Sequence, residues 1–417
     1  MGAAIPAPRP AAGTGGPADC GRGDRDAAAG GRPKTAIRAR CPVYRWPMSP
    51  RREVRPSSGL VAMVLRRLGR AAALALAGLL ALAGPASAHA IGGAGPTNFQ
   101  TRILAVKPAV PGIDVRVVEA GSRLELTNTS GREVIVLGYA SEPYLRIGPD
   151  GVFENERSPA TFLNKDSLGQ VQVPSTADAK AAPEWKKVSG ANHAAWHDHR
   201  VHWMGQQPPP EVQDAPGQVH VVNPTWTVPL RLGEQQIAVT GDLRWVPGPS
   251  PLPSIVVAVG LCLLALVAGR LRSWPRLLAV LLGLLIVIDV VYTGGTWTAL
   301  RSTVAVKAYG SLIAAAGWAV GVVAIVQLLR NKLESGLFYL IFAAGLMTVI
   351  GGLGDLPALT SSQLVSDLPD WATRAAVASK VGLGLGIALA GLLRLRQTGR
   401  PPAEPAPTSE PQVPQGP

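Results

Sequence analysis

RLLAVLLGLLIVIDVVYT, residues 276–293, is the stretch that decides how this chain folds. Its length is close to the roughly 20 apolar residues that a helix needs to cross the hydrocarbon core of a bilayer. Four further apolar runs of similar length are present, near residues 254–269, 308–329, 336–353 and 372–393. The sequence therefore predicts an all-α bundle of five transmembrane helices over residues 251–396, with the lipid bilayer as its surroundings.

The charges of the connecting loops predict the orientation of this bundle. Basic residues gather in the loops at 270–276 and 330–332 and after the last apolar run, at 394–400. The loop at 354–371 has three aspartates and no basic residue. Because basic loops stay on the cytoplasmic side, we expect a multi-pass plasma-membrane protein with its N-terminal domain outside. The Pro-rich residues 397–417 then form a disordered cytoplasmic tail.

The N-terminal 88 residues divide into a leader and a signal peptide. Residues 1–62 are rich in Gly, Pro, Arg and Ala without periodicity, so they are a disordered extension or lie upstream of the true translation start. Residues 63–88 have the arginines, the apolar run and the final small-x-small pattern of a signal peptide. Cleavage after Ala88 makes His89 the mature N-terminus, whereas cleavage after Ala90 removes it.

Charge and cysteine content exclude two classes of protein. The formal net charge is +13, but residues 1–62 contain ten Arg and one Lys against four acids and so supply +7 of it. No basic face on a folded domain is predicted, so we expect no nucleic-acid binding. Two of the three cysteines lie in the leader and the third lies in an apolar run, which leaves no disulfide framework.

Residues 89–250 have the pattern of an exported all-β domain. Short alternating runs occur at 101–106, 113–119, 122–127 and 133–138, then around 219–230 and 235–246. Turn residues such as Asn128-Thr129-Ser130-Gly131 separate them. Strands at this spacing predict a β-sandwich of the cupredoxin or immunoglobulin-like kind.

The stretch HAAWHDHRVHWM, residues 193–204, contains four of the six histidines. In an extended chain His193, His197 and His199 point to one side, and His202 points to the other unless the chain turns. Converging imidazoles predict a site for copper, with zinc as the alternative, and Met204 adds a soft thioether. The same cluster also fits a hydrogen-bonded loop or a pH-responsive contact without metal.

Two further histidines bear on this site. A mature N-terminal His89 offers both its α-amine and its ring to one metal ion, unless it is an incidental residue at a cleavage site. His220 lies in the apolar run Val219-His220-Val221-Val222 and is expected to belong to the fold.

An N-terminal histidine followed by Trp196-His197-x-His199 and Met204 resembles the B subunit of the particulate methane and ammonia monooxygenases. The resemblance implies an exported cupredoxin-like domain that binds copper through His89, His197 and His199. More distantly, the chain resembles the small periplasmic copper-resistance proteins of the CopC type. It departs from the monooxygenase pattern after the β domain, because no second cupredoxin-like domain follows.

We therefore expect a membrane-anchored extracytoplasmic protein for copper capture, storage or delivery, whose partners include other copper-handling or membrane oxidase proteins. One alternative is a component of a copper-dependent membrane monooxygenase or oxidase. Another is a structural or interaction protein without metal. Whether the chain is an enzyme stays open, although the absence of nucleotide, serine-hydrolase and zinc-protease motifs favours a non-enzyme.

Two ionisable residues lie well inside the predicted spans. Asp289 and Lys380 fall in the outer halves of their apolar runs, and we expect them to pair, with Arg374 as an alternative partner. Alternatively, each side chain reaches the membrane surface by itself. Gly382 and Gly386 are spaced to allow close helix packing.

Overall fold

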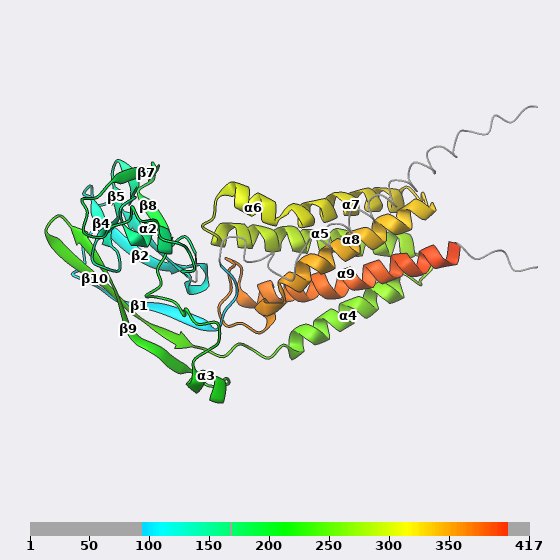
Figure 1. Ribbon diagram of the computed structural model, residues 1–417. Helices are drawn as coiled ribbons and strands as arrows, with labels where there is room; N and C mark the ends of the chain where they lie inside the picture. Colours follow the sequence, from blue (N-terminus) through cyan, green and yellow to red (C-terminus); the bar gives the residue numbers. More distant parts are fainter. Residues whose placement is uncertain (1–93, 167–168, 399–417) are drawn as a thin grey trace, which may run out of the picture. The chain divides into compact units, whose positions relative to one another are not determined.

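A computed structural model describes residues 94–166 and 169–398 of this chain. All described residues belong to one compact unit. Ten strands come first and the helices α4 to α9 follow (Figure 1). The predicted leader, signal peptide and His89, and the tail from residue 399, lie outside the described residues.

The strands form two antiparallel sheets. The larger has the order β1-β10-β9-β4-β5-β6-β7 and the smaller the order β2-β3-β8. The strands are β1 (Phe99–Lys107), β2 (Ile113–Val118), β3 (Arg123–Asn128), β4 (Val134–Leu137), β5 (Pro143–Gly148), β6 (Gly151–Asn155), β7 (Trp185–Ser189), β8 (His193–His197), β9 (His220–Leu232) and β10 (Gln235–Trp245). Three short helical segments connect them: η2 (Glu119–Gly121), α2 (Pro159–Leu163) and α3 (Pro210–Asp214).

One apolar core joins the two sheets. Leu124 and Leu126 of β3 and Trp196 of β8 are buried in the same cluster as Val134 and Val136 of β4. The alternation of these residues along each strand buries one face of each sheet, which is the pattern that the sequence predicted. The prediction of an all-β domain is therefore confirmed, together with six of its strands.

Four strands, β5 to β8, were not predicted. β5 begins at a proline, and β7 and β8 read WKKVS and HAAWH, without the β-branched alternation that identifies a strand in sequence. Pairing with neighbouring strands keeps these segments extended.

The helices that follow are α4 (Leu252–Ala268), α5 (Trp274–Ala299), α6 (Val304–Gly310), α7 (Leu312–Leu329), α8 (Ser335–Gly354) and α9 (Asp370–Thr398), with the short η3 (Leu356–Leu359) between the last two. Four of them, α5, α7, α8 and α9, are long and apolar enough to cross a membrane. The remaining predicted span, residues 254–269, corresponds to α4, which is apolar but has only 17 residues. The predicted segment 308–329 is divided at Ser311, which ends α6 and begins α7.

Helix α9 packs against α4, α5 and α8. A Cβ atom on Gly382 would lie 2.1 Å from the carbonyl oxygen of Ala258 in α4, and one on Gly386 would lie 2.6 Å from that of Cys262. These contacts leave no room for a side chain, so the expected close packing at the two glycines is confirmed.

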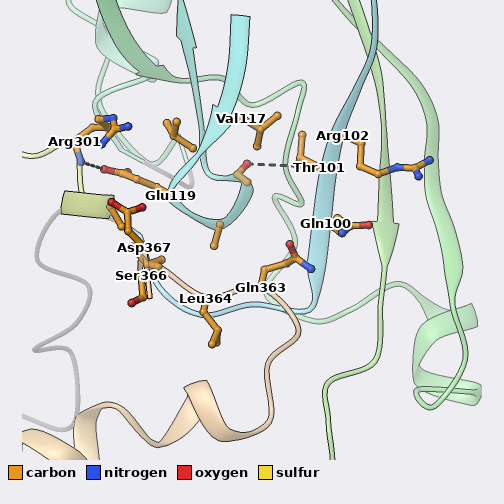
Figure 2. A pocket seen from close by; sticks show the side chains of 15 residues that line it. Gln100, Thr101, Arg102, Val117, Glu119, Arg301, Gln363, Leu364, Ser366 and Asp367 are labelled. Carbon is orange, nitrogen blue, oxygen red and sulfur yellow. Dashed lines mark hydrogen bonds between the residues drawn. The ribbon is translucent and has the colours of Figure 1, made fainter. Parts of the chain in front are cut away.

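Loops of the helical region contact the β region. Thr97 forms a bridge with Gln363, and the backbone N–H of Arg301 donates to the carboxylate of Glu119. The Arg301 guanidinium also pairs with Glu125 of β3, at 2.8 Å. A cavity of about 320 Å³ lies beside these contacts. Figure 2 shows Glu119, Arg301, Gln363 and Asp367 among the side chains that line it.

Candidate metal-binding site

The histidine-rich segment is part strand and part turn. Strand β8 pairs with β3, with Thr127 opposite His193 and Arg123 opposite His197. The strand ends at His197, and a backbone hydrogen bond from Val201 to Asp198 closes the turn that follows. The alternation expected for an extended chain therefore applies to His193 and His197 but does not continue to His199. The turn brings His202 back toward the other rings.

Asp198, at the start of this turn, is completely buried and fully hydrogen-bonded. Its carboxylate accepts two hydrogen bonds of 2.7 Å from the Arg200 guanidinium and one of 3.2 Å from the Trp196 indole. The backbone N–H of Arg200 donates to it as well, at 3.2 Å. These contacts use both carboxylate oxygens.

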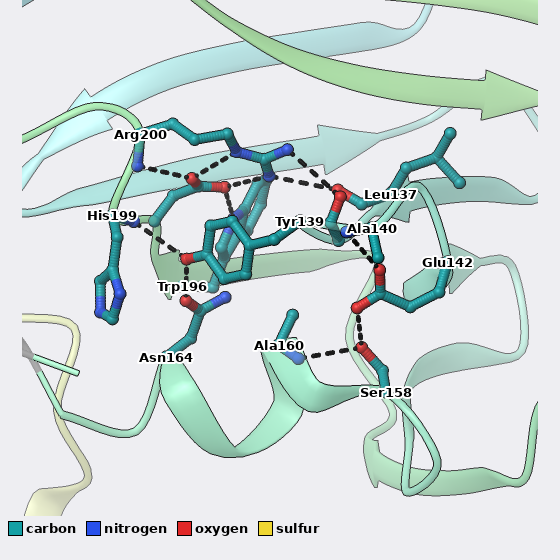
Figure 3. A network of polar contacts seen from close by, with 12 residues as sticks. Leu137, Tyr139, Ala140, Glu142, Ser158, Ala160, Asn164, Trp196, His199 and Arg200 are labelled. Carbon is teal, nitrogen blue, oxygen red and sulfur yellow. Dashed lines mark hydrogen bonds and ion pairs between the residues drawn. The ribbon is translucent and has the colours of Figure 1, made fainter. Parts of the chain in front are cut away.

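Arg200 and Tyr139 extend this network. The guanidinium donates to the carbonyl oxygen of Leu137 at 3.1 Å and lies over the Tyr139 ring (Figure 3). The Tyr139 hydroxyl donates to the Asn164 side chain and accepts from the backbone N–H of His199. Burial raises the pKa of Tyr139, so the phenol stays protonated and keeps donating. Trp196, Asp198 and Arg200 thus form a hydrogen-bonded loop, as one of the two interpretations of this segment expected.

The imidazole rings of His197, His199 and His202 lie together. The ring centroid of His202 is 5.6 Å from that of His199 and 6.4 Å from that of His197, and it is edge-on to both. The end of β8 and the turn after it therefore bring three imidazole rings close together.

Hydrogen bonds to backbone carbonyls fix the tautomer of each ring. A carbonyl oxygen only accepts, so the ring nitrogen that faces it must carry the proton, and the other nitrogen of a neutral ring holds the lone pair. In His197, Nδ1 lies 2.9 Å from the carbonyl oxygen of Ser122, and Nε2 accepts a hydrogen bond of 3.1 Å from Arg123. Both nitrogens of His197 are therefore in use.

His199 and His202 differ from His197 in this respect. Nε2 of His199 faces the carbonyl oxygen of Asp166 at 3.0 Å, which assigns the lone pair to Nδ1. Nδ1 of His202 faces the carbonyl oxygen of Trp203 at 3.2 Å, which assigns the lone pair to Nε2. Within the described part of the chain, this buried Nε2 atom has no hydrogen-bond partner. Two neighbouring rings thus present lone pairs that the fold does not use.

The electrostatic surroundings keep the rings of His197 and His202 neutral. Burial, followed by the positive charge of Arg123, lowers the pKa of His197 to about 4. Burial also lowers the pKa of His202. A neutral imidazole is the form that binds a metal ion, so no proton has to leave these two rings at pH 7.

The side chain of Met204 ends near Gly169, which also borders the ring of His199. A Cβ atom built on Gly169 would lie 2.8 Å from Cε1 of His199 and 3.7 Å from the methyl carbon of Met204. Gly169 has φ +66°, a backbone conformation that favours glycine, so the small residue leaves room for both side chains. The thioether and the His199 ring are therefore neighbours.

The other predicted ligands lie apart from this cluster. His193 is exposed at the opposite end of β8, near Trp297 and Lys307. His220, at the start of β9, faces the carbonyl oxygen of Ala215 at 2.7 Å. Among residues 94–166 and 169–398, no group of three or more His, Cys, Asp or Glu side chains is arranged to hold a metal ion. Two available imidazoles and one thioether are a partial set of ligands.

The helical region contains a second polar cluster, which the sequence predicted only in part. Lys380 Nζ lies 3.0 Å from Asp289, which confirms the expected pair. It also lies 2.7 Å from Asp355, a residue that the sequence analysis counted only as a loop acid. The alternative partner Arg374 pairs with Asp370 instead. The position of Asp355 directly after the apolar run 336–353 is the sequence feature that could have predicted its pairing with Lys380.

Comparisons with protein-family models, with curated proteins and with solved structures find no match to this chain.

Proposed function

We propose that this chain is a membrane-anchored, extracytoplasmic copper-binding protein that captures, stores or delivers copper through His199, His202 and Met204. The observation that carries the proposal is the pair of adjacent imidazoles in which backbone carbonyls hold one nitrogen and leave the other as a lone pair. Histidine ligands of metal ions are commonly fixed in this way by a hydrogen bond from their second ring nitrogen.

The chemistry of these ligands favours copper over other metals. Imidazole nitrogen suits copper and zinc, whereas the thioether of Met204 is a soft ligand that selects Cu(I). The carboxylate of Asp198 in the same turn is not available as a ligand, because its buried oxygens are hydrogen-bonded to Arg200 and Trp196. Hard cations, which prefer oxygen ligands, are therefore disfavoured.

Two further ligands complete the proposed site. His89, when it is the mature N-terminus, contributes an amine and a ring nitrogen. His197 becomes available when Arg123 releases its Nε2 atom. Arg123 already lies 3.0 Å from Glu119, so its charge keeps a carboxylate partner after that release.

Hand-over of copper fits the exposure of the site better than catalysis. His199, His202 and Met204 are all half-buried, so an incoming chelator meets the site at the surface of the β region and needs only a local side-chain movement to reach the covered Nε2 atom of His202. The expected orientation, with the β region outside the membrane, would place the site on the extracytoplasmic side.

The test is a copper titration of the full chain in detergent, with Cu(I) measured against a chromophoric chelator and Cu(II) by electron paramagnetic resonance. We expect His199→Gln and His202→Gln each to lower copper affinity by at least about tenfold, because each removes one nitrogen ligand. Met204→Leu should weaken Cu(I) binding more than Cu(II) binding, because it removes a soft ligand.

His193→Gln is the matched control, since it changes a histidine of the same segment, residues 193–204, that lies outside the cluster, and it should leave affinity unchanged. A chain that begins one residue before His89 should bind Cu(II) more weakly than one that begins at His89. Equal affinity of the wild type and both His199 and His202 variants would overturn the proposal. Preferential binding of Zn(II) would replace copper by the alternative metal.

A further inference from the structure

A second cavity, of about 650 Å³, lies between the small sheet and the loop that follows α5. Pockets of this size hold small organic molecules. The Arg301 guanidinium reaches from the loop to the sheet, where it lies 2.8 Å from Glu125, and its backbone N–H donates to Glu119 (Figure 2). The titratable side chains of the cavity wall come from both regions and are Arg116, Glu125, His193, Arg301 and Lys307.

Basic side chains outnumber carboxylates along this wall. Arg116, Arg301 and Lys307 line the cavity together with a single carboxylate, that of Glu125. This carboxylate is shared, because it lies 3.2 Å from Arg116 and 2.8 Å from Arg301. Asp114, outside the wall, also pairs with Arg116 at 3.2 Å, so the basic groups still exceed the acids when it is included. The wall therefore favours an anionic ligand.

Lys307 and Ser302 have hydrogen-bonding capacity that the fold does not use. Within the described part of the chain, the Lys307 ammonium pairs with no carboxylate and donates one hydrogen bond, of 2.6 Å, to the carbonyl oxygen of Trp297. An ammonium group has three N–H donors, so further donors remain for a ligand. The buried Ser302 hydroxyl has no hydrogen-bond partner among the described residues. Two side chains of one loop and the helix after it can therefore serve the same anion.

The cavity lies beside the end of a helix that can cross a membrane. Helix α5 is long and apolar enough to do so and ends at Ala299, between the wall residues Trp297 and Leu300. The end of a membrane-spanning helix lies at the level of the lipid headgroups, where tryptophan is enriched. Phosphate groups of phospholipids are present at this level.

We propose that this cavity binds a phosphate ester, with the Lys307 ammonium and the Arg116 guanidinium on the phosphate oxygens. Both groups are common phosphate ligands, the first as a compact charge and the second as a pair of donors. We expect the Ser302 hydroxyl to turn toward the bound phosphate, which supplies its missing partner. Trp297 and Leu300 offer an apolar surface to the organic part of the ligand.

The ester has two possible sources, the headgroup of an anionic phospholipid and a soluble metabolite. Both carry the same phosphate group, so the same side chains would hold either one. Binding here does not rest on the proposed copper site, because His193 lies at the opposite end of β8 from His197.

Thermal unfolding of the full chain in detergent tests the proposal with two probes. Glycerol 3-phosphate is a soluble phosphate ester, and phosphatidylglycerol, added to the micelles, carries the ester in a lipid headgroup. A ligand that binds the folded chain raises the unfolding temperature once its concentration exceeds its Kd. We expect this of at least one probe, whereas glycerol and diacylglycerol, the matched probes without phosphate, should have no effect. Stabilisation by phosphatidylglycerol alone assigns the lipid source, and stabilisation by glycerol 3-phosphate assigns a soluble one.

Lys307→Met should lower the apparent affinity for the active probe by about tenfold or more, because it removes a charged donor. Ser302→Ala should lower it by about threefold, because it removes a neutral donor. Lys307→Arg keeps the charge and should retain most of the affinity, which distinguishes a lost ligand contact from a failure to fold.

Lys332→Met is the matched control, since it changes an exposed lysine after α7 that lies outside the cavity and should leave the affinity unchanged. Absence of stabilisation by both probes in the wild type would overturn the proposal. Equal affinity of the wild type, Lys307→Met and Arg116→Gln would overturn it as well.

Discussion

Two buried ionic clusters, one in each region of the molecule, differ in how their charges are paired. In the β region Asp198 and Arg200 balance one negative charge with one positive charge, and hydrogen bonds use both carboxylate oxygens. In the helical region the ammonium of Lys380 lies between two carboxylates, 3.0 Å from Asp289 and 2.7 Å from Asp355. The first cluster pairs one guanidinium with one carboxylate, whereas the second shares one ammonium between two carboxylates.

The two clusters also differ in whether their charges can be removed. A guanidinium does not lose its proton in a protein, so Arg200 stays charged whatever its surroundings. A carboxylate that loses its partner is neutralised by protonation. Breaking the Asp198–Arg200 pair should therefore cost more than breaking the Lys380 cluster, and the predictions below measure that difference.

The largest effect is expected for Asp198→Asn. It leaves the buried Arg200 guanidinium without a counter-charge, and we expect a loss of about 3–5 kcal/mol in the free energy of unfolding of the β region. Thermal unfolding of the full chain in detergent, followed by circular dichroism and by limited proteolysis, measures it. Asp114→Asn is the control, because that carboxylate is 64% exposed and its loss should cost less than about 0.5 kcal/mol. Equal losses for the two variants would show that the buried pair has no special role.

A smaller loss, about 2–3 kcal/mol, is expected for Lys380→Met, because protonation of the two carboxylates offsets part of the cost of removing the ammonium. The loss should grow as the pH rises, since the carboxylates then ionise more readily in the unfolded chain. In an Asp289→Asn background the same substitution should cost less, but more than nothing, because Asp355 still pairs with Lys380. Thermal unfolding in detergent over a range of pH completes this double-mutant cycle. Strictly additive losses would contradict the shared cluster.

The smallest effect on stability is expected for the uncharged His197, which directly precedes Asp198 in the chain. Its pKa is lowered from 6.5 to about 4, so between these values the unfolded chain binds more protons than the folded chain. Stability due to His197 is therefore present above pH 6.5 and is lost as the pH falls toward 4. Acidification from about pH 7 to about pH 5 should cost about 2 kcal/mol through this residue. His197→Gln should flatten that part of the thermal-unfolding profile, and an unchanged slope would contradict the assignment.

Much of the architecture followed from local pattern in the sequence. The apolar runs identified the helices, because burying a continuous run of this length in lipid requires a helix that satisfies its own backbone hydrogen bonds. Alternation identified six strands, since one face of each is buried. The Asp289–Lys380 pair was also predictable, because isolated charges inside a span require partners.

The sites depended on contacts that no local pattern contains. The residues 193–204 indicated a metal site by their proximity, but the availability of each imidazole depends on which carbonyl it meets. Ser122 and Arg123 of another strand occupy His197, whereas Asp166 and Trp203 leave one nitrogen of His199 and of His202 unused. Position along the chain does not predict such partners.

The sequence by itself therefore determined the two regions, the run of apolar helices and the presence of a histidine-rich segment, because these depend on the periodicity of neighbouring residues. Only the tertiary structure decided which histidines have free lone pairs and that Asp355 joins Asp289 and Lys380. The physical reason is the same for both sites. Except for Trp203, which is next to His202, the partners that set these lone pairs and ion pairs are distant in sequence, and packing of strands and helices brings them together.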